Sequence, residues 1–212
     1  GLVLLAEEMP GVQSAAFTFL LPAGAMHDPA DRGGAASMLS EWITRGAGER
    51  DSRELLTALD QLGINHGEGA QTVHSSVSAA GLGRNLVPAL ELFADILLRP
   101  HLDDDEIEPI RALSLQSLQS LEDDPGSKVI YELRRRHFPD PWGRPAPGTP
   151  EGVAAIPPFD LRAFHAARYR PNGTILSVAG AIEWESLRDA VGRLFGDWAP
   201  GTEPTVNSRP AG

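Results

Sequence analysis

Apolar residues along the chain recur at two spacings, and each spacing predicts a different element. Runs of β-prone residues predict strands at residues 2–5 and 15–21, separated by the turn-forming Pro10-Gly11. Residues 64–72 and 74–82 predict a strand pair, in which Val77 and its neighbours alternate with small or polar residues. Residues 173–182 predict a buried strand.

Helical spacing of the apolar positions predicts helices at residues 33–45, 52–62, 85–100, 103–121, 159–169 and 183–198. In the fourth helix we expect Asp103 at the N-cap and Glu106 at N3, which assigns the acidic run 103–108 to a helix N-terminus rather than to a metal site. Pro109 is expected to kink this helix early. Residues 138–153 are rich in Pro and Gly and predict a loop.

Strands and helices alternate irregularly, so we expect an α+β fold in which helices cover a largely antiparallel sheet. With 212 residues, 42% of them hydrophobic, the chain can bury the core of one large domain. We place that domain at residues 1–198. Residues 199–212 are polar and broken by Pro and Gly, as linkers are.

The composition excludes several classes of function. A net charge of -11, with Lys128 as the only lysine, argues against nucleic acid and anionic lipid as partners. No apolar run approaches the roughly 20 residues of a membrane helix, so no membrane partner is expected. The absence of cysteine excludes disulfides and thiolate metal sites. Plentiful Ala, Gly, Pro and Arg are typical of a GC-rich genome.

The helix predicted at residues 33–45, within GGAASMLSEWITRGAG, has one polar face. Ser37, Ser40, Glu41 and Thr44 share that side, and Ala36, Leu39 and Ile43 share the side that can pack. The polar face is therefore either ordinary surface or a place for chemistry.

Several stretches, taken in their order and spacing, carry a resemblance to a known family. They are GLVLLAEEMPGVQSAAFTFLLPAGAMHDP, the glycine-rich entry to the 33–45 helix, LDQLGINHGEGAQT, ELFADILLRPHLDDDEIE, LEDDP, PWGRPAPGT and LRAFHAARYRPNGTILSVAG. This order resembles the N-terminal domain of the pitrilysin/insulinase zinc peptidases, particularly the mitochondrial processing peptidases and their bacterial relatives. The resemblance implies the metallohydrolase-like fold of that domain, a second homologous domain beyond the linker, and a soluble protein of the bacterial cytoplasm or periplasm.

Active members of that family carry H-x-x-E-H on this helix, with two zinc-binding imidazoles and a glutamate that activates water. Alignment through GGAA and TRGAG places the pentad at Ser37-Met38-Leu39-Ser40-Glu41, so Ser37 and Glu41 stand at the imidazole positions and Ser40 at the base. Counting back from LEDDP places the distal glutamate at Ser117. Serine hydroxyls are poor zinc donors and poor bases at neutral pH, so we expect no metal and no catalytic residue in this chain.

Other chemistry finds little support in the sequence. No two of the six histidines lie four residues apart on a predicted helix, which favours structural or surface roles for His27, His66, His74, His101, His137 and His165. A serine nucleophile would need a histidine base, and the chain has no G-x-S-x-G elbow.

The glycines around HGEGA could let another backbone approach closely. The family resemblance implies that this segment, with His66, Gly67, Glu68 and Gly69, is a sheet edge where peptide substrates add as a strand. Two hypotheses follow. The chain is part of a non-catalytic subunit that forms a heterodimer with an active, zinc-bearing H-x-x-E-H subunit, or it is a stand-alone peptide-binding or scaffold module.

Overall fold

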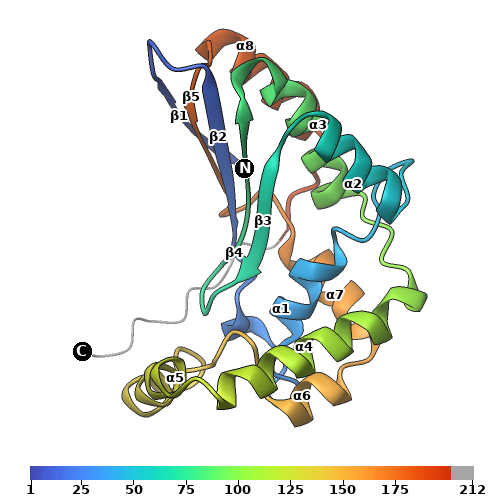
Figure 1. Ribbon diagram of the computed structural model, residues 1–212, viewed down its shortest axis with the longest axis vertical. Helices are drawn as coiled ribbons and strands as arrows, with labels where there is room; N and C mark the ends of the chain where they lie inside the picture. The colour runs from blue at the N-terminus through green and yellow to red at the C-terminus, as the bar shows by residue number, and fades with distance from the viewer. Residues whose placement is uncertain (202–212) are drawn as a thin grey trace.

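The computed structural model describes residues 1–201, and the predicted linker at 199–212 lies largely outside them (Figure 1). The strands are β1 (Val3–Glu8), β2 (Ser14–Leu21), β3 (Asn65–Ala70), β4 (Ser75–Leu82) and β5 (Ile175–Gly180). The α-helices are α1 (Ala35–Trp42), α2 (Ser52–Gln61), α3 (Leu86–Leu98), α4 (Ile107–Glu122), α5 (Pro125–His137), α6 (Pro150–Ala155), α7 (Pro158–Arg168) and α8 (Trp184–Phe195). No helix within residues 1–201 is both long and apolar enough to cross a bilayer.

The five strands form one sheet in the order β1-β5-β2-β4-β3. β1 pairs parallel with β5, and the three other pairings are antiparallel, which confirms the predicted α+β class with a largely antiparallel sheet. β3 and β1 are the two edge strands. The parallel pair brings together the two ends of the described chain. Its paired residues Val3 and Ile175 are 172 positions apart in the sequence (175 minus 3).

Helices α3 and α8 pack on one face of the sheet, as Figure 1 shows, whereas α5 contacts the rest of the molecule mainly through α4. Phe17 and Phe19 of β2 point to that face and are almost fully buried. Phe17 meets Phe93 of α3 edge-on at 5.0 Å between ring centroids, and Phe19 packs on Phe195 of α8 at 5.3 Å. The β-prone run that predicted β2 thus contains core residues that alternate with residues of the other face. The partly or fully exposed small residues of that face include Ala16, Thr18, Ser78, Ala80 and Ser177.

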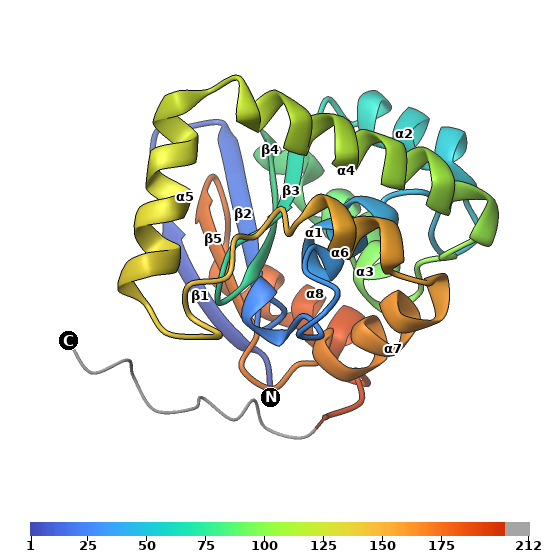
Figure 2. The same ribbon diagram turned by 90° about the horizontal axis from the view of Figure 1, so that it is seen from below.

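Helix α1 lies inside the helical layer, in contact with α4, α7, β3 and β4 (Figure 2). It ends at Trp42, three residues before the predicted end, because the chain tightens: Arg45 N–H donates to the carbonyl of Trp42. Ala36, Leu39 and Ile43 are buried, as predicted, and so are Met38 and Trp42. The helix is therefore enclosed on more sides than its amphipathic pattern indicates.

Two expectations for the fourth predicted helix were wrong. Asp103 makes no side-chain cap, because a short 3-10 turn, Asp104–Glu106, precedes α4. Pro109 is the third residue of α4, where a backbone N–H has no partner within the helix in any case. The proline therefore removes no helical hydrogen bond there and gives no cause for a kink.

Two helices were missed by the sequence analysis. α6 lies inside the segment predicted as a loop and is capped by Thr149, whose hydroxyl accepts from Gly152 N–H. α5 has no buried residue, although Val129, Ile130 and Leu133 follow helical spacing and form an exposed apolar side. Asp124, which caps it, and Pro125 at its first position are the signals that could have revealed it.

Candidate functional site

The N-terminus of α1 is fixed by the carboxylate of Asp28. Asp28 Oδ2 accepts from Gly34 N–H at 2.7 Å and Oδ1 accepts from Ala36 N–H at 2.9 Å. Asp28 is 5% exposed, and burial raises its pKa to about 6, while the two backbone hydrogen bonds and the charge of Arg144 oppose the rise. The carboxylate thus satisfies N–H groups that α1 itself leaves without partners.

Glycines bring the start of α1 against the loop that precedes α6. Gly148 has φ +78°, and a Cβ there would lie 2.2 Å from the carbonyl oxygen of Gly33. Gly34 has φ +109°, and its Cβ would lie 2.7 Å from Val153 Cγ2. Backbone meets backbone here, so these two glycines are required by conformation and by space.

The residues that the family resemblance assigned to chemistry lie one to two turns further along α1. Ser37 is partly exposed. Ser40 is 3% exposed, and its hydroxyl donates to the carbonyl of Ser37 at 2.8 Å. Packing of α1 against its neighbours encloses Ser40, so this position is not ordinary solvated surface, which was one of the two alternatives for the polar face. A hydroxyl bonded to its own helix is not free to act as a base or nucleophile.

Glu41 and Glu68 belong to one charged cluster between α1 and β3. Glu41 Oε1 accepts from Arg45 Nη2 at 2.5 Å. His66 Nδ1 lies 3.7 Å from Glu68 Oε2. Burial, and then the charge of Glu41, raises the pKa of Glu68, whereas His66 and Arg45 act in the opposite direction. The sequence analysis named Glu41 and Glu68 for separate reasons and did not predict that they interact.

β3 is the edge of the sheet, and its backbone is oriented for a further partner. Gln71 N–H donates to the carbonyl of His74 at 2.8 Å, just beyond β3. Hydrogen-bonded and non-bonded pairs alternate along an antiparallel ladder, so Gly67 and Gly69 face β4 while the backbone groups of His66 and Glu68 point outward. At both glycines a Cβ would meet nothing within 4 Å, so the sheet face toward which these two positions point is open there. Peptide addition at this edge stays a prediction.

Ser117 is an exposed residue of α4, the helix that packs against α1. Ser117 is expected to converge with Ser37 and Glu41 between α4 and α1, and this stays a prediction. These residues offer two hydroxyls and one carboxylate, and that carboxylate is already paired with Arg45. They do not fit zinc, which takes imidazole, thiolate and carboxylate donors. Within residues 1–201 no three His, Cys, Asp or Glu side chains form a group that could hold a metal ion.

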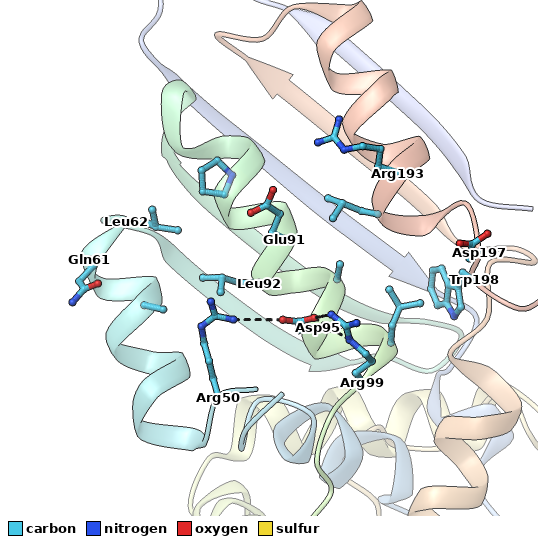
Figure 3. A pocket seen from close by; sticks show the side chains of 15 residues that line it. Arg50, Gln61, Leu62, Glu91, Leu92, Asp95, Arg99, Arg193, Asp197 and Trp198 are labelled. Atoms are coloured by element: carbon cyan, nitrogen blue, oxygen red, sulfur yellow. Dashed lines mark hydrogen bonds and ion pairs between the residues drawn. The ribbon is translucent and has the colours of Figure 1, made fainter. Parts of the chain in front are cut away.

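A groove of about 870 Å³ runs between α2, α3 and the end of α8 and contains none of the predicted site residues (Figure 3). At one end of the groove, the carboxylate of Asp95 is paired with two arginines. Asp95 is 8% exposed and lies between Arg50 Nη1 at 3.5 Å and the guanidinium of Arg99, whose Nε donates at 3.1 Å. Both arginines are engaged by one carboxylate, so this network ties the loop before α2 to α3 and supplies no free catalytic group.

Comparison with known proteins gives consistent matches. Residues 3–141 match the insulinase family of peptidases, peptidase family M16. An uncharacterised zinc protease of Mycobacterium leprae is 28% identical over 197 residues, which cover 92% of this chain and 44% of that protein. A probable mitochondrial-processing peptidase subunit beta of Arabidopsis thaliana is 24% identical, covering 99% of this chain and 39% of that protein. The chain spans less than half the length of these two relatives.

Solved structures share the fold. A peptidase M16 inactive domain from Pseudomonas fluorescens superposes with a TM-score of 0.88 at 21% identity, covering 98% of this chain and 51% of that one. Pitrilysin superposes with a TM-score of 0.86 at 18% identity, covering all of this chain and 24% of that one. The match over residues 3–141 covers well over half of the chain, and the fold agrees with it. The chain therefore belongs to the insulinase family, peptidase family M16.

Proposed function

We propose that this chain is the N-terminal domain of a catalytically inactive M16 protein that serves as the non-catalytic subunit of a heteromeric metallopeptidase. The donor set on α1 carries the proposal: Ser37, Ser40 and Glu41 stand in the aligned pentad, with Ser40 bonded to its own helix and Glu41 paired with Arg45. Zinc and the water-activating glutamate would then be supplied by a partner subunit that carries H-x-x-E-H. The fold shared with an M16 inactive domain of Pseudomonas fluorescens is compatible with this assignment.

The role proposed for this subunit is to hold peptide at the β3 edge. The outward backbone groups of His66 and Glu68 can pair with an extended peptide as an added strand. Main-chain pairing of this kind depends little on peptide sequence, which suits a subunit that presents varied peptides to a partner's metal centre. A second homologous domain beyond residue 198 would complete the chamber in which the two subunits enclose the peptide.

The first experiment is co-purification of the full-length protein with M16 proteins of its source organism that carry H-x-x-E-H. We expect one of these to form a stable complex whose peptidase activity exceeds that of the zinc-bearing subunit alone. In that complex, replacing a zinc-binding histidine of the partner abolishes activity, whereas Ser40→Ala in this chain changes it less than about twofold. A protein that binds peptide but no such partner would instead be a scaffold module.

The second experiment tests the β3 edge in the same complex. Glu68→Pro removes one outward N–H without breaking a bond to β4 and blocks strand addition. Glu68→Gln is the matched control, since it keeps the backbone donor and alters only the charge. We expect Glu68→Pro to raise KM for peptides by about tenfold or more relative to Glu68→Gln, the size of one or two lost backbone hydrogen bonds. Equal KM values for the two variants would exclude strand addition at β3.

A further inference from the structure

A separate cavity of about 310 Å³ opens where β2 ends, beside the β3–β4 turn and the loop that follows α5. Leu20, Met26, Val73, Trp142 and Ile175 form most of its wall. Ligand-binding pockets begin at about 300 Å³, and an apolar cavity of about 150 Å³ already accommodates benzene. The cavity is therefore large enough for one or two aromatic rings.

The wall of this cavity disfavours cationic ligands. It contains no Asp, Glu, Lys or Arg side chain, although the chain as a whole carries a net charge of -11. A cationic group entering it would lose its hydration without gaining a counter-charge, and it would meet the positive field of Arg168 and Arg144. An uncharged ring would replace water against Leu20, Val73 and Trp142, which is favourable for apolar surface.

His27 and His74 are the two polar side chains of the wall, and His27 offers a polar anchor. Burial, and then the charges of Arg168 and Arg144, lowers the pKa of His27 to about 4, so its imidazole is neutral at pH 7. A neutral imidazole carries one N–H donor and one acceptor nitrogen. The hydrogen bonds that residues 1–201 form with histidine rings involve His101 and His165, not His27. The ring of His27 therefore retains its hydrogen-bonding capacity for a ligand.

We infer that this cavity binds an uncharged aromatic ring that carries one hydrogen-bonding group, of the size of phenol or indole. The ring lies between Leu20, Val73 and Trp142, and its polar hydrogen or oxygen pairs with the imidazole of His27. Benzylammonium, which has a similar ring and one positive charge, is excluded.

Titration of the 212-residue chain with indole, followed by backbone NMR shifts, tests the site directly. We expect saturable binding with a Kd of roughly 0.1–1 mM and the largest shifts at Val73, His74 and Gly173, which border the cavity. Benzylammonium should cause no saturable shifts at these residues. Absence of saturation by indole, or shifts centred on the groove between α2, α3 and α8, would overturn the assignment.

Two tryptophan substitutions locate the binding. Val73→Trp fills the cavity and should weaken indole binding at least about tenfold. Val129→Trp places the same side chain on the exposed face of α5, where Val129 is 63% exposed, and should leave the Kd unchanged. If Val73→Trp unfolds the chain, the shift map of the unaltered protein still decides. A folded Val73→Trp variant with unchanged Kd would refute the site.

His27→Leu separates the polar anchor from the apolar wall. Toluene has the ring without a hydrogen-bonding group, so its affinity should be kept in His27→Leu. Indole affinity should fall about three- to tenfold, the effect of one lost hydrogen bond. An equal change for toluene and indole would show that His27 makes no such bond.

The natural source of the ring is resolved by comparing indole with N-acetyltryptophanamide. If the amide binds at least as tightly, the occupant is an aromatic side chain of another polypeptide. If the backbone of the amide prevents entry while indole binds, the occupant is a free small molecule. Both results support an aromatic site, and failure of both probes contradicts it.

Discussion

The two ends of α1 differ in what their residues do. At the N-terminal end the contacts hold the helix in place: Asp28 accepts from Gly34 and Ala36, and Gly148 lets two backbones touch. Further along the helix, the side-chain hydrogen bond of Ser40 stays within α1, because its hydroxyl donates to the carbonyl of Ser37. The frame that would position a metal site is thus maintained by packing and hydrogen bonds that do not depend on the site itself. Loss of ligands from such a frame is compatible with full retention of the fold.

The largest effect is expected from Gly148→Ala in the frame. A Cβ at φ +78° is strained, and it would collide with the backbone of Gly33, which cannot move aside as a side chain can. We expect the free energy of unfolding to fall by at least about 2 kcal/mol. Gly192→Ala in α8 is the control, since nothing lies within 4 Å of its Cβ, and it should stabilise by about 0.5–1 kcal/mol. Equal urea midpoints for the two variants would contradict the proposed role of Gly148.

Asp28→Asn is expected to have the next largest effect, and a particular pH dependence. At pH 7 it places an amide NH2 against one of the two buried N–H groups that donate to the carboxylate, and should cost about 1–3 kcal/mol. The pKa of Asp28 is about 6 when folded, above its ordinary value, so Asp28 adds stability as pH falls through 6. The gap between the wild-type chain and Asp28→Asn should therefore widen by about 2 kcal/mol between pH 7 and pH 4.5.

His27 supplies the control for that pH dependence. Its pKa is lowered to about 4, so the unfolded chain takes up a proton before the folded chain does, and stability is lost as pH falls from 6.5 toward 4. His27→Gln should remove this loss, which is opposite in sign to the gain from Asp28. Urea unfolding at both pH values distinguishes the two, and a narrowing gap for Asp28→Asn would refute the protonation account.

Glu41→Gln should alter electrostatics more than stability. Its charge raises the pKa of Glu68, so the pKa of Glu68 should fall in the variant. The ion pair of Glu41 with Arg45 is partly exposed, and its loss should cost less than about 1 kcal/mol. Carboxyl ¹³C NMR titration measures the Glu68 pKa, with the exposed Glu91→Gln as the control. An unchanged Glu68 pKa would mean that the two carboxylates do not interact.

Ser40→Ala should have the smallest effect. The hydroxyl bonds only to the carbonyl of Ser37 within the same helix, so its removal leaves no buried group without a partner. We expect a change within about 0.5 kcal/mol in the free energy of unfolding. A loss larger than that of Asp28→Asn would reverse the contrast between frame and site.

The sequence was sufficient for the sheet and for most helices because their apolar periodicity matches how they pack. β2 and β4 alternate as they must when one face is buried, and α2 begins at Asp51, which forms a capping box with Glu54. α5 was not predicted although its apolar residues Val129, Ile130 and Leu133 recur at helical spacing. These residues are exposed, so their pattern does not correspond to packing.

The candidate site could be predicted only in part. The sequence is enough to align Ser37-Met38-Leu39-Ser40-Glu41 with H-x-x-E-H. The burial of Ser40, however, depends on which helices surround α1. Asp28 caps a helix from six and eight residues away, beyond the local spacing of a capping box. The interaction of Glu41 with Glu68 joins α1 to an edge strand, and no local pattern encodes such a contact.

Zinc content tests the central claim most directly, that the frame is kept while the metal donors are absent. The chain and its variant Ser37→His, Ser40→Glu, Glu41→His, Ser117→Glu are dialysed against zinc, freed of excess metal and measured by elemental analysis. The account predicts well under one equivalent in the unaltered chain and close to one in the variant, because the variant restores imidazole and carboxylate donors. One equivalent of chelator-sensitive zinc in the unaltered chain would contradict it.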